Sequence, residues 1–242
     1  MVSRIRAAVR AAAPSADNPA LARALAAVQE VPREAFVPTT LRSEAYHEIP
    51  LPIGYDQTIS NPYIVAIMTA AADPGHNAKV LDIGTGSGYQ AAVLAKLAGQ
   101  VVSIEIVPQL ADQARERLTR LGFANVAVHT GDGYAGWPER APFDAIIVAA
   151  GAARVPQPLL DQLKVGGRLV MPVGRSWATE QILVVTRTSD TEYRRCSLGW
   201  SMFVPLTGQG KRPQNANGLF EKIPLCFENE VAHPDFEPAT PK

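Results

Sequence analysis

The sequence predicts an α/β fold in which a mostly parallel sheet is covered by helices on both faces. From about residue 78 onward, short apolar stretches alternate with segments of helical periodicity, as in strands that are joined by helical crossovers. A glycine-rich run directly follows the first apolar stretch, and 47% of the 242 residues are hydrophobic, enough for one substantial core. We therefore expect one domain over residues 1–208. An extended tail is expected over residues 209–242, where Pro, Asn, Gly and Glu accumulate.

The first part of the chain is expected to be helical. Met1–Ala13 is rich in Arg and Ala, and Ile5 and Val9 lie one helical turn apart. This spacing favours an amphipathic surface helix over a targeting segment, since no continuous apolar stretch is present there. Ala20–Val28 shows the same periodicity and is expected to form a second helix.

Seven stretches are expected to be strands of the sheet. The fourth is almost wholly apolar, which is typical of a strand that is buried on both faces. The predicted strands are Lys79–Ile83, Val101–Ile106, Val126–His129, Asp144–Ala149, Arg168–Val173, Gln181–Thr186 and Trp200–Val204. A short helix is expected over Pro158–Leu163, with Gly166-Gly167 ending it before the fifth strand.

The charge balance and the cysteine content exclude several classes of site. The chain has 23 Lys and Arg and 23 Asp and Glu, so no net field favours nucleic acid. No apolar stretch is long enough to cross a bilayer. Cys196 and Cys226 form neither a Cys-x-x-Cys pair nor a cluster with the four histidines, so we expect neither a disulfide nor a metal site. Unpaired thiols in turn indicate a reduced, cytoplasmic setting.

The most informative motif is the glycine turn after the first predicted strand, Gly84-Thr85-Gly86-Ser87-Gly88. Glycines there let the backbone approach a ligand closely, and a helix that starts near Ser87 points its amide groups at the same place. The spacing differs from the usual dinucleotide fingerprint, and an acidic residue, Asp82, precedes the first glycine. This turn favours a ligand that has an amino-acid end and no phosphate, and S-adenosylmethionine is such a ligand.

Two further acidic residues follow the next two predicted strands. Glu105 ends the second strand, where a carboxylate can accept both hydroxyls of a ribose. Asp132, in Gly131-Asp132-Gly133, follows the third strand and can accept a hydrogen bond from an adenine amino group. Each acid alone is typical of a solvated loop. Because ligands of open α/β sheets bind at the carboxyl ends of the strands, the three together predict nucleoside binding.

A polar loop precedes the predicted sheet. In Gln57–Pro62, Asn61 and Pro62 resemble a cap and the first turn of a helix, and the preceding Leu51–Gly54 is expected to be a loop. Ser60 can be part of a polar turn at this helix start or can contact a ligand. Nothing near it resembles the His and Asp partners of a nucleophilic serine.

These features together resemble the protein-L-isoaspartate (D-aspartate) O-methyltransferase family over roughly Val31–Gly208. The glycine turn is common to many methyltransferases, whereas the Thr-Ile-Ser-x-Pro loop and the Val-Pro-Leu-Thr segment are much more specific. The blocks that carry the resemblance are Val31–Pro38, Leu51–Gly54, Gln57–Tyr63, Asp82–Gln90, Gly131–Gly133, Ala141–Ile146, Gln162–Gly174 and Phe203–Thr207.

The resemblance implies a Rossmann-like class I methyltransferase sheet of seven strands that uses S-adenosyl-L-methionine. It implies that Ser60 is the active-site serine and that the loop before it covers the cofactor. The implied cofactor-contacting residues are Gln57, Thr58, Ile59, Ser60, Asp82, Gly84, Thr85, Gly86, Glu105, Asp132, Gly133 and Thr207. The implied reaction esterifies the α-carboxylate of an isoaspartyl residue in a damaged protein, and the ester then closes to a succinimide.

Two segments depart from the family pattern and leave alternatives open. Ala149–Ala153 lacks the proline and threonine often found after the fourth strand, and this segment is expected to border the substrate. The tail beyond Gly210 is longer than the usual family ending.

A monomer is expected, with oligomerisation through the tail as the alternative. The alternative functions are methylation of aspartate in a dedicated partner peptide and non-catalytic binding of S-adenosylmethionine.

Overall fold

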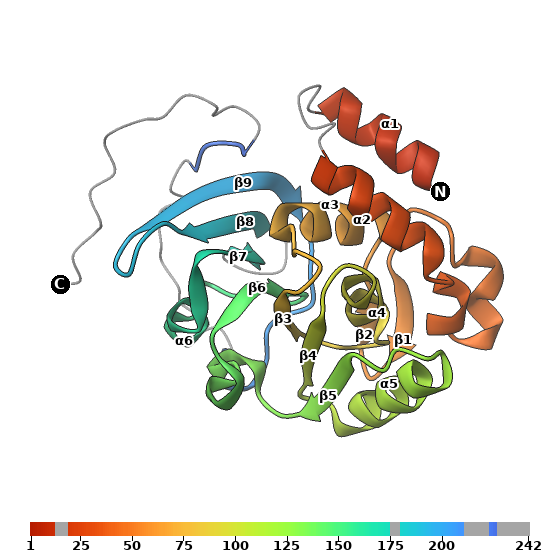
Figure 1. The fold of residues 1–242 in the computed structure, drawn as a ribbon. Helices are drawn as coiled ribbons and strands as arrows, with labels where there is room; N and C mark the ends of the chain where they lie inside the picture. The colour runs from red at the N-terminus through yellow and green to blue at the C-terminus, as the bar shows by residue number, and fades with distance from the viewer. Residues whose placement is uncertain (13–18, 175–179, 211–222, 227–242) are drawn as a thin grey trace.

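The computed structural model describes residues 1–12, 19–174, 180–210 and 223–226, and its centre is a seven-stranded sheet (Figure 1). The strand order is β5-β4-β3-β6-β7-β8-β9. Strands β5 to β7 of this order pair in parallel, whereas β8 is antiparallel to β7 and β9 is antiparallel to β8. The bounds are β3 Lys79–Ile83, β4 Gln100–Glu105, β5 Val126–Thr130, β6 Phe143–Val148, β7 Leu163–Val173, β8 Glu180–Arg187 and β9 Tyr193–Ser201. The mostly parallel sheet predicted from the sequence is thus confirmed.

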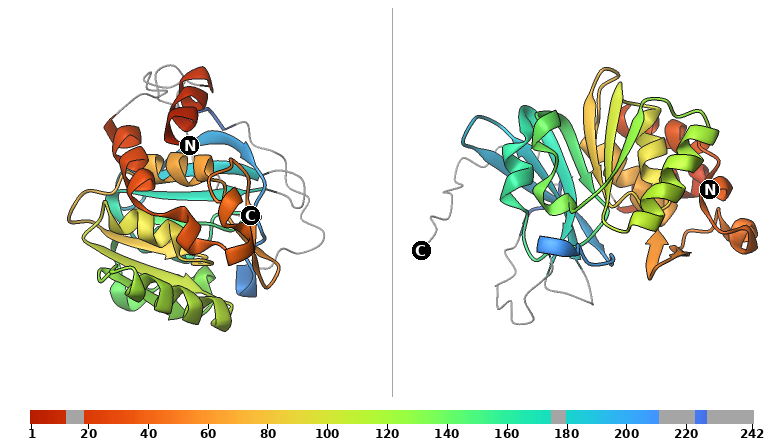
Figure 2. Two further views of the ribbon diagram at one scale, coloured as in Figure 1. Left: turned by 90° about the vertical axis from the view of Figure 1, so that its right-hand side faces the viewer. Right: turned by 90° about the horizontal axis from the view of Figure 1, so that it is seen from below.

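Helices cover both faces of this sheet (Figure 2). Alternate residues of one strand point to opposite faces, so Val80 of β3 belongs to the core cluster that includes residues of α1 to α5, while Leu81 belongs to the cluster that includes residues of α6. The helices are α1 Val2–Ala12, α2 Pro19–Glu30, α3 Pro62–Ala72, α4 Tyr89–Ala95, α5 Pro108–Arg120 and α6 Gln157–Asp161. Short 3-10 helices lie at η2 Arg33–Phe36, η3 Thr39–Glu44, η4 Gly133–Ala135, η5 Pro138–Arg140 and η6 Gly208–Gly210.

Two of the predicted strands have bounds that differ by more than one residue from those in the structure. β7 begins at Leu163, so Gly166 and Gly167 lie inside the strand and do not end α6. The register between β6 and β7 shifts at this point, which accommodates the extra residues as a bulge. The last strand is Tyr193–Ser201, not Trp200–Val204, because it pairs as a hairpin with β8. Its exposed arginines on the sheet edge concealed the alternation expected of a strand.

The expectation that Leu51–Gly54 is a loop is wrong. This stretch is strand β1, and it pairs antiparallel with β2, Gln57–Ile59. The turn between them places Tyr55 and Asp56 at positive φ. Hairpin turns of this kind usually contain Asn-Gly or Asp-Gly, and the sequence has neither pair here. Because Leu51 and Ile59 are paired and both buried, the hairpin is fixed to the domain at its base.

The expectation of two unpaired cysteines is also wrong, because Cys196 and Cys226 form a disulfide. The tail returns to the edge of the sheet there, where the Ser197 amide donates to Pro224 O at 2.9 Å and the Cys226 amide donates to Ser197 O at 2.9 Å. The sequence offers no motif for this pair, which lies 30 residues apart. Disulfides persist mainly in oxidising compartments, so these two cysteines no longer support the expectation of a reduced, cytoplasmic setting.

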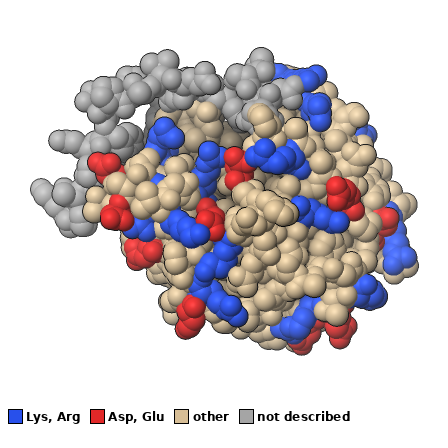
Figure 3. Space-filling model, viewed as in Figure 1, with Lys and Arg blue, Asp and Glu red and all other residues tan. Residues whose placement is uncertain are grey.

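The surface carries both signs of charge. On the face drawn in Figure 3, Lys and Arg are interspersed with Asp and Glu. Among the described helices, none is both long enough and apolar enough to span a membrane. The described residues contain no group of three or more His, Cys, Asp and Glu side chains that could hold a metal ion.

Candidate active site

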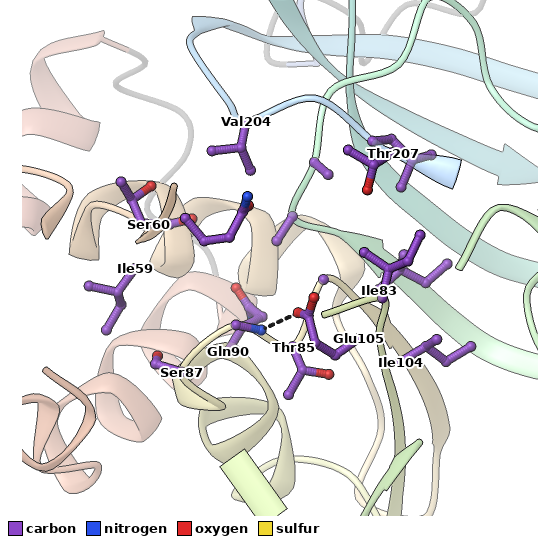
Figure 4. Close-up of a pocket in the computed structure, with 18 of the residues that line it drawn as sticks. Ile59, Ser60, Ile83, Thr85, Ser87, Gln90, Ile104, Glu105, Val204 and Thr207 are labelled. Carbon is purple, nitrogen blue, oxygen red and sulfur yellow. Dashed lines mark hydrogen bonds between the residues drawn. The ribbon is translucent and has the colours of Figure 1, made fainter. Parts of the chain in front are cut away.

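A cleft of about 750 Å³ lies at the carboxyl ends of the central strands (Figure 4). It surrounds the end of β3, whose neighbours are β4 on one side and β6 on the other. This is the point at which the strand order reverses, and open α/β sheets bind ligands there. The lining residues are Gln57, Thr58, Ile59, Ser60, Val65, Ile83, Gly84, Thr85, Gly86, Ser87, Tyr89, Gln90, Ile104, Glu105, Ile106, Asp132, Ala149, Ala150, Val204, Pro205, Leu206 and Thr207.

The glycine turn after β3 forms the floor of the cleft. The amides of Gly84 and Thr85 donate to Ile104 O at 2.9 and 3.2 Å, which fixes the turn against β4. Gly86 has φ +52, and a Cβ there would lie 3.2 Å from Ile53 Cδ1 of the β1–β2 hairpin. Glycine therefore serves both the backbone conformation and the close approach of the hairpin. Gly84, Thr85 and Gly86, which the resemblance implies to contact the cofactor, all line the cleft.

Glu105 is the buried acid of the cleft, with 5% of its surface exposed. Its Oε2 accepts the Gly86 amide at 2.7 Å, drawn in Figure 4, and its Oε1 accepts the Val107 amide at 3.0 Å. A carboxylate has about four acceptor sites, so each oxygen keeps a lone pair for a further donor. Glu105 can therefore accept two ligand hydroxyls while it holds the glycine turn in place.

Two predicted contact residues lie beneath the cleft and not in its lining. Asp82 is fully buried and accepts a hydrogen bond from Ser103 Oγ at 2.7 Å, because Ile83 is the strand residue that points into the cleft. Burial raises the pKa of Asp82 to about 7. Gly133 packs under Ile83, and a Cβ there would lie 2.3 Å from Ile83 Cγ2. Glycine at this position lets η4 pack directly on the end of β3.

Asp132 lines the cleft and also connects two of its walls. Its Oδ1 accepts the Tyr134 amide at 2.9 Å, as the cap of η4. Its Oδ2 accepts the Gln209 amide at 2.7 Å, which anchors the segment that includes the exposed Thr207. The sequence suggested an acceptor for a ligand amino group here. In the structure, the same carboxylate in addition holds the end of the Val204–Thr207 wall.

The four residues Gln57–Ser60 form the opposite wall. In Figure 4, Ile59 and Ser60 lie across the cleft from Ile83 and Ile104. Ser60 is half-buried between β2 and α3, and its hydroxyl makes no hydrogen bond to any other described residue. Asn61 caps α3 by accepting the Tyr63 amide at 2.7 Å, and it donates to Glu48 O at 2.7 Å. The backbone next to Ser60 is therefore fixed, while its hydroxyl remains available to a substrate.

Sequence reasoning missed most of the apolar lining. Ile83, Ile104 and Ile106 form an apolar wall on either side of Glu105, and their positions at strand ends were the available signal. Ala149 and Ala150 follow β6 and line the cleft, in the segment that was expected to border the substrate. Val204, Pro205 and Leu206 were noticed only as a family block. They are held by two hydrogen bonds with Gly151, at 2.8 Å each.

The charge of the lining is distinctive. Glu105 and Asp132 are acidic, and among the described residues that line the cleft none is Lys or Arg. Phosphates are bound by Lys, Arg or helix N-termini, so a pyrophosphate would face two carboxylates with no Lys or Arg and only the N-terminus of the short helix α4 to offset them. The cleft is suited to a nucleoside that carries positive charge instead.

Comparison with known proteins agrees with this geometry. The family model of protein-L-isoaspartate(D-aspartate) O-methyltransferase matches residues 18–211. The chain belongs to this family. A protein-L-isoaspartate O-methyltransferase 2 of Marinobacter nauticus is 58% identical over 187 residues, which cover 77% of this chain and 85% of the relative. Another from Polaromonas is 50% identical over 212 residues, which cover 86% of this chain and all of the relative.

Solved structures of the family have the same fold. A protein-L-isoaspartate O-methyltransferase structure superposes with a TM-score of 0.73 over 87% of this chain and 67% of its own, at 28% identity. A Plasmodium falciparum structure in complex with S-adenosyl-L-homocysteine superposes with a TM-score of 0.68 over 85% of this chain and 97% of its own. Because the identity in that pair is 22%, the likeness supports the fold alone.

Proposed function

We propose that this member of the family transfers the methyl group of S-adenosyl-L-methionine to the α-carboxylate of L-isoaspartyl residues in damaged proteins. The observation that carries the proposal is the cleft itself, which pairs a buried acid, Glu105, on one wall with an available hydroxyl, Ser60, on the other. The cofactor wall is suited to a nucleoside with positive charge, and the hydroxyl is suited to an acceptor carboxylate.

The residues present fit the cofactor. Glu105 has a spare lone pair on each oxygen for the two ribose hydroxyls. Asp132 lies at the end of the cleft where it can accept the adenine amino group, and the apolar Ile104 and Ile106 flank the site of the nucleoside. The amides and small side chains of the Gly84–Gly86 turn leave room for the amino-acid end. S-adenosylmethionine, when bound, supplies an activated methyl group on a positively charged sulfur.

The protein's own task is alignment. A substrate carboxylate is ionised at neutral pH and is already a nucleophile, so no residue has to remove a proton from it. The Ser60 hydroxyl can donate a hydrogen bond to one carboxylate oxygen, which leaves the other directed at the methyl carbon. The new bond joins that oxygen to the methyl carbon, the carbon–sulfur bond breaks, and its electron pair stays on the sulfur. Holding the reacting atoms in line is a large part of the catalysis of such transfers.

The product of this step is a methyl ester, and the enzyme's part ends there. The ester closes spontaneously to a succinimide, since the adjacent backbone nitrogen displaces methanol. Hydrolysis of the succinimide partly restores normal aspartate, which accounts for the repair. A normal aspartate presents its β-carboxylate, one methylene away from Cα, in place of the α-carboxylate that isoaspartate carries on Cα, so the wall opposite Glu105 has to distinguish the two paths of the backbone.

Methyl transfer to paired peptides tests the proposal. The two synthetic peptides are identical except for isoaspartate or aspartate at one position, and the methyl group of S-adenosylmethionine is radiolabelled. We expect label only in the isoaspartyl peptide. Label in neither peptide, with S-adenosylhomocysteine still bound in calorimetry, would overturn the repair function and favour a dedicated partner peptide or a non-catalytic role.

A further inference from the structure

A buried arginine lies between the two walls of the cleft and has no part in the function described so far. Arg33 is the first residue of η2, within the Val31–Pro38 block, and its side chain is completely buried. Its Nε donates to Ala45 O at 2.7 Å, and its Cζ lies 5.0 Å from the centroid of the Tyr89 ring. Phe36 of the same block meets that ring edge-on, at 5.5 Å between centroids.

Each contact of Arg33 leads to a different wall. Tyr89 lines the cleft and opens α4, directly after the glycine turn. Ala45 is the C-cap of η3, three residues before Glu48, whose carbonyl accepts the Asn61 side chain beside Ser60. A second link joins the same two walls, because Gln90 Nε2 of α4 donates to Thr69 Oγ1 of α3 at 2.9 Å, with both side chains buried.

The free-energy cost of burying the Arg33 guanidinium indicates that this side chain does more than fill space in the core. Arg33 Nη1 and Nη2 are buried without a hydrogen-bond partner among the described residues. Burial lowers the pKa of Arg33 to about 10, so the side chain is still charged at neutral pH. A methionine of similar length would fill the same space without the desolvation cost of a buried charge.

Resting on the proposed function, we propose that Arg33 is a positioning residue that sets the Ser60 wall against the glycine turn. Its Nε holds the Ala45 carbonyl, and its guanidinium lies over the Tyr89 ring, so the distance between the acceptor carboxylate and the methyl donor depends on it. A misplacement of about 1 Å at a reacting centre lowers turnover by up to about a hundredfold. The effect should fall on kcat, because the cofactor contacts of Glu105 and Asp132 are untouched.

The test compares Arg33→Met with a matched variant. Arg187 also binds backbone carbonyls, donating to Leu163 O at 2.6 Å, but it does so at the far end of β8 and outside the cleft. For Arg33→Met we expect kcat on the isoaspartyl peptide to fall about tenfold, with the S-adenosylhomocysteine Kd within about threefold and stability retained. Arg33→Lys keeps the charge over the ring and should recover part of the kcat. Arg187→Met should lower stability and leave the kcat of the folded enzyme unchanged.

Several outcomes would overturn the assignment. One is an unchanged kcat in folded Arg33→Met. Another is a loss of activity in Arg33→Met that is fully explained by a smaller amount of folded protein, as is expected for Arg187→Met. If Arg33→Met does not fold, Arg33→Lys keeps the charge but replaces the guanidinium that contacts both Ala45 and Tyr89, and a kcat equal to that of wild type there contradicts the proposal. Wild-type protein in the same assay distinguishes a failure of the proposed function from a failure of the positioning role. An inactive wild type would contradict the proposed function and not the role of Arg33.

Discussion

The two walls of the cleft are built in different ways. The floor and the cofactor wall come from the carboxyl ends of β3 and β4, where Gly84, Gly86 and Glu105 are joined to the sheet by short hydrogen bonds. The facing wall comes from segments outside the sheet, namely the β1–β2 hairpin with Ser60 and the Val204–Thr207 segment. We propose that the sheet supplies fixed hydrogen-bond acceptors for the cofactor, whereas the added segments supply the groups that select the methyl acceptor. We therefore expect mutations in the two walls to separate cofactor affinity from turnover.

The largest effect is expected at Glu105 on the cofactor wall. Glu105→Gln keeps the shape but replaces one acceptor oxygen with an amide group that cannot accept from Gly86 or Val107. Hydrogen bonds to charged groups contribute about 1.5–3 kcal/mol, so the S-adenosylhomocysteine Kd should rise by roughly a hundredfold. Isothermal titration calorimetry measures this directly. A Kd within threefold of wild type would remove Glu105 from the ribose site.

Ser60→Ala tests the facing wall. The variant removes a hydroxyl that has no described partner in the protein, so stability should be unchanged. We expect kcat on an isoaspartyl peptide to fall by about tenfold or more, as for the loss of a hydrogen bond of about 1.5 kcal/mol in the transition state, while the S-adenosylhomocysteine Kd stays within threefold. Steady-state kinetics with calorimetry separates the two quantities. Equal losses in both would show that Ser60 serves the cofactor.

Asp132 lies where the two walls meet, and its replacement should show a mixed effect. Asp132→Ala removes the acceptor for a ligand amino group and also frees the Gln209 amide that anchors the Val204–Thr207 segment. We expect cofactor binding to weaken by about 1–3 kcal/mol, the cost of leaving the bound amino group without its acceptor. Calorimetry would contradict this role if the dissociation constant did not change.

The buried Asp82, beneath the cofactor wall, should affect how the stability of the protein depends on pH. Burial raises its pKa to about 7, so between about pH 4 and pH 7 the folded protein holds a proton there that the unfolded chain has released. This group therefore makes the free energy of unfolding fall as pH rises through that window. Asp82→Asn removes this pH dependence. The free energy of unfolding of the variant, relative to that of wild type, should therefore increase from pH 5 to pH 8. Urea unfolding at both pH values would contradict the assignment if the difference were constant.

The same contrast explains what the sequence could predict. Strand ends and glycine spacing are local signals, and they located Gly84, Gly86, Glu105 and Asp132 at one edge of the sheet. Which of two adjacent residues faces the ligand depends on strand direction and packing, so Asp82 was expected in the cleft although Ile83 occupies that position. The facing wall depends on contacts far apart in the chain.

Those distant contacts are the ones the sequence did not reveal. The Cys196–Cys226 disulfide, the Asp132–Gln209 hydrogen bond and the Arg33–Tyr89 contact each join segments that no local pattern relates. Ser60 could be named only because a family resemblance covered its loop. Within the predicted tail, Leu225 pairs with Ser197 of β9.

A crystal structure with S-adenosylhomocysteine and an isoaspartyl peptide tests the division between the walls most directly. We predict the ribose hydroxyls on Glu105 and the cofactor sulfur directed toward the Ser60 side of the cleft. The peptide carboxylate should contact the Ser60 hydroxyl, with the peptide backbone against the hairpin and the Val204–Thr207 segment. A ligand bound away from Glu105, or a carboxylate held by the glycine turn with Ser60 uninvolved, would contradict the account.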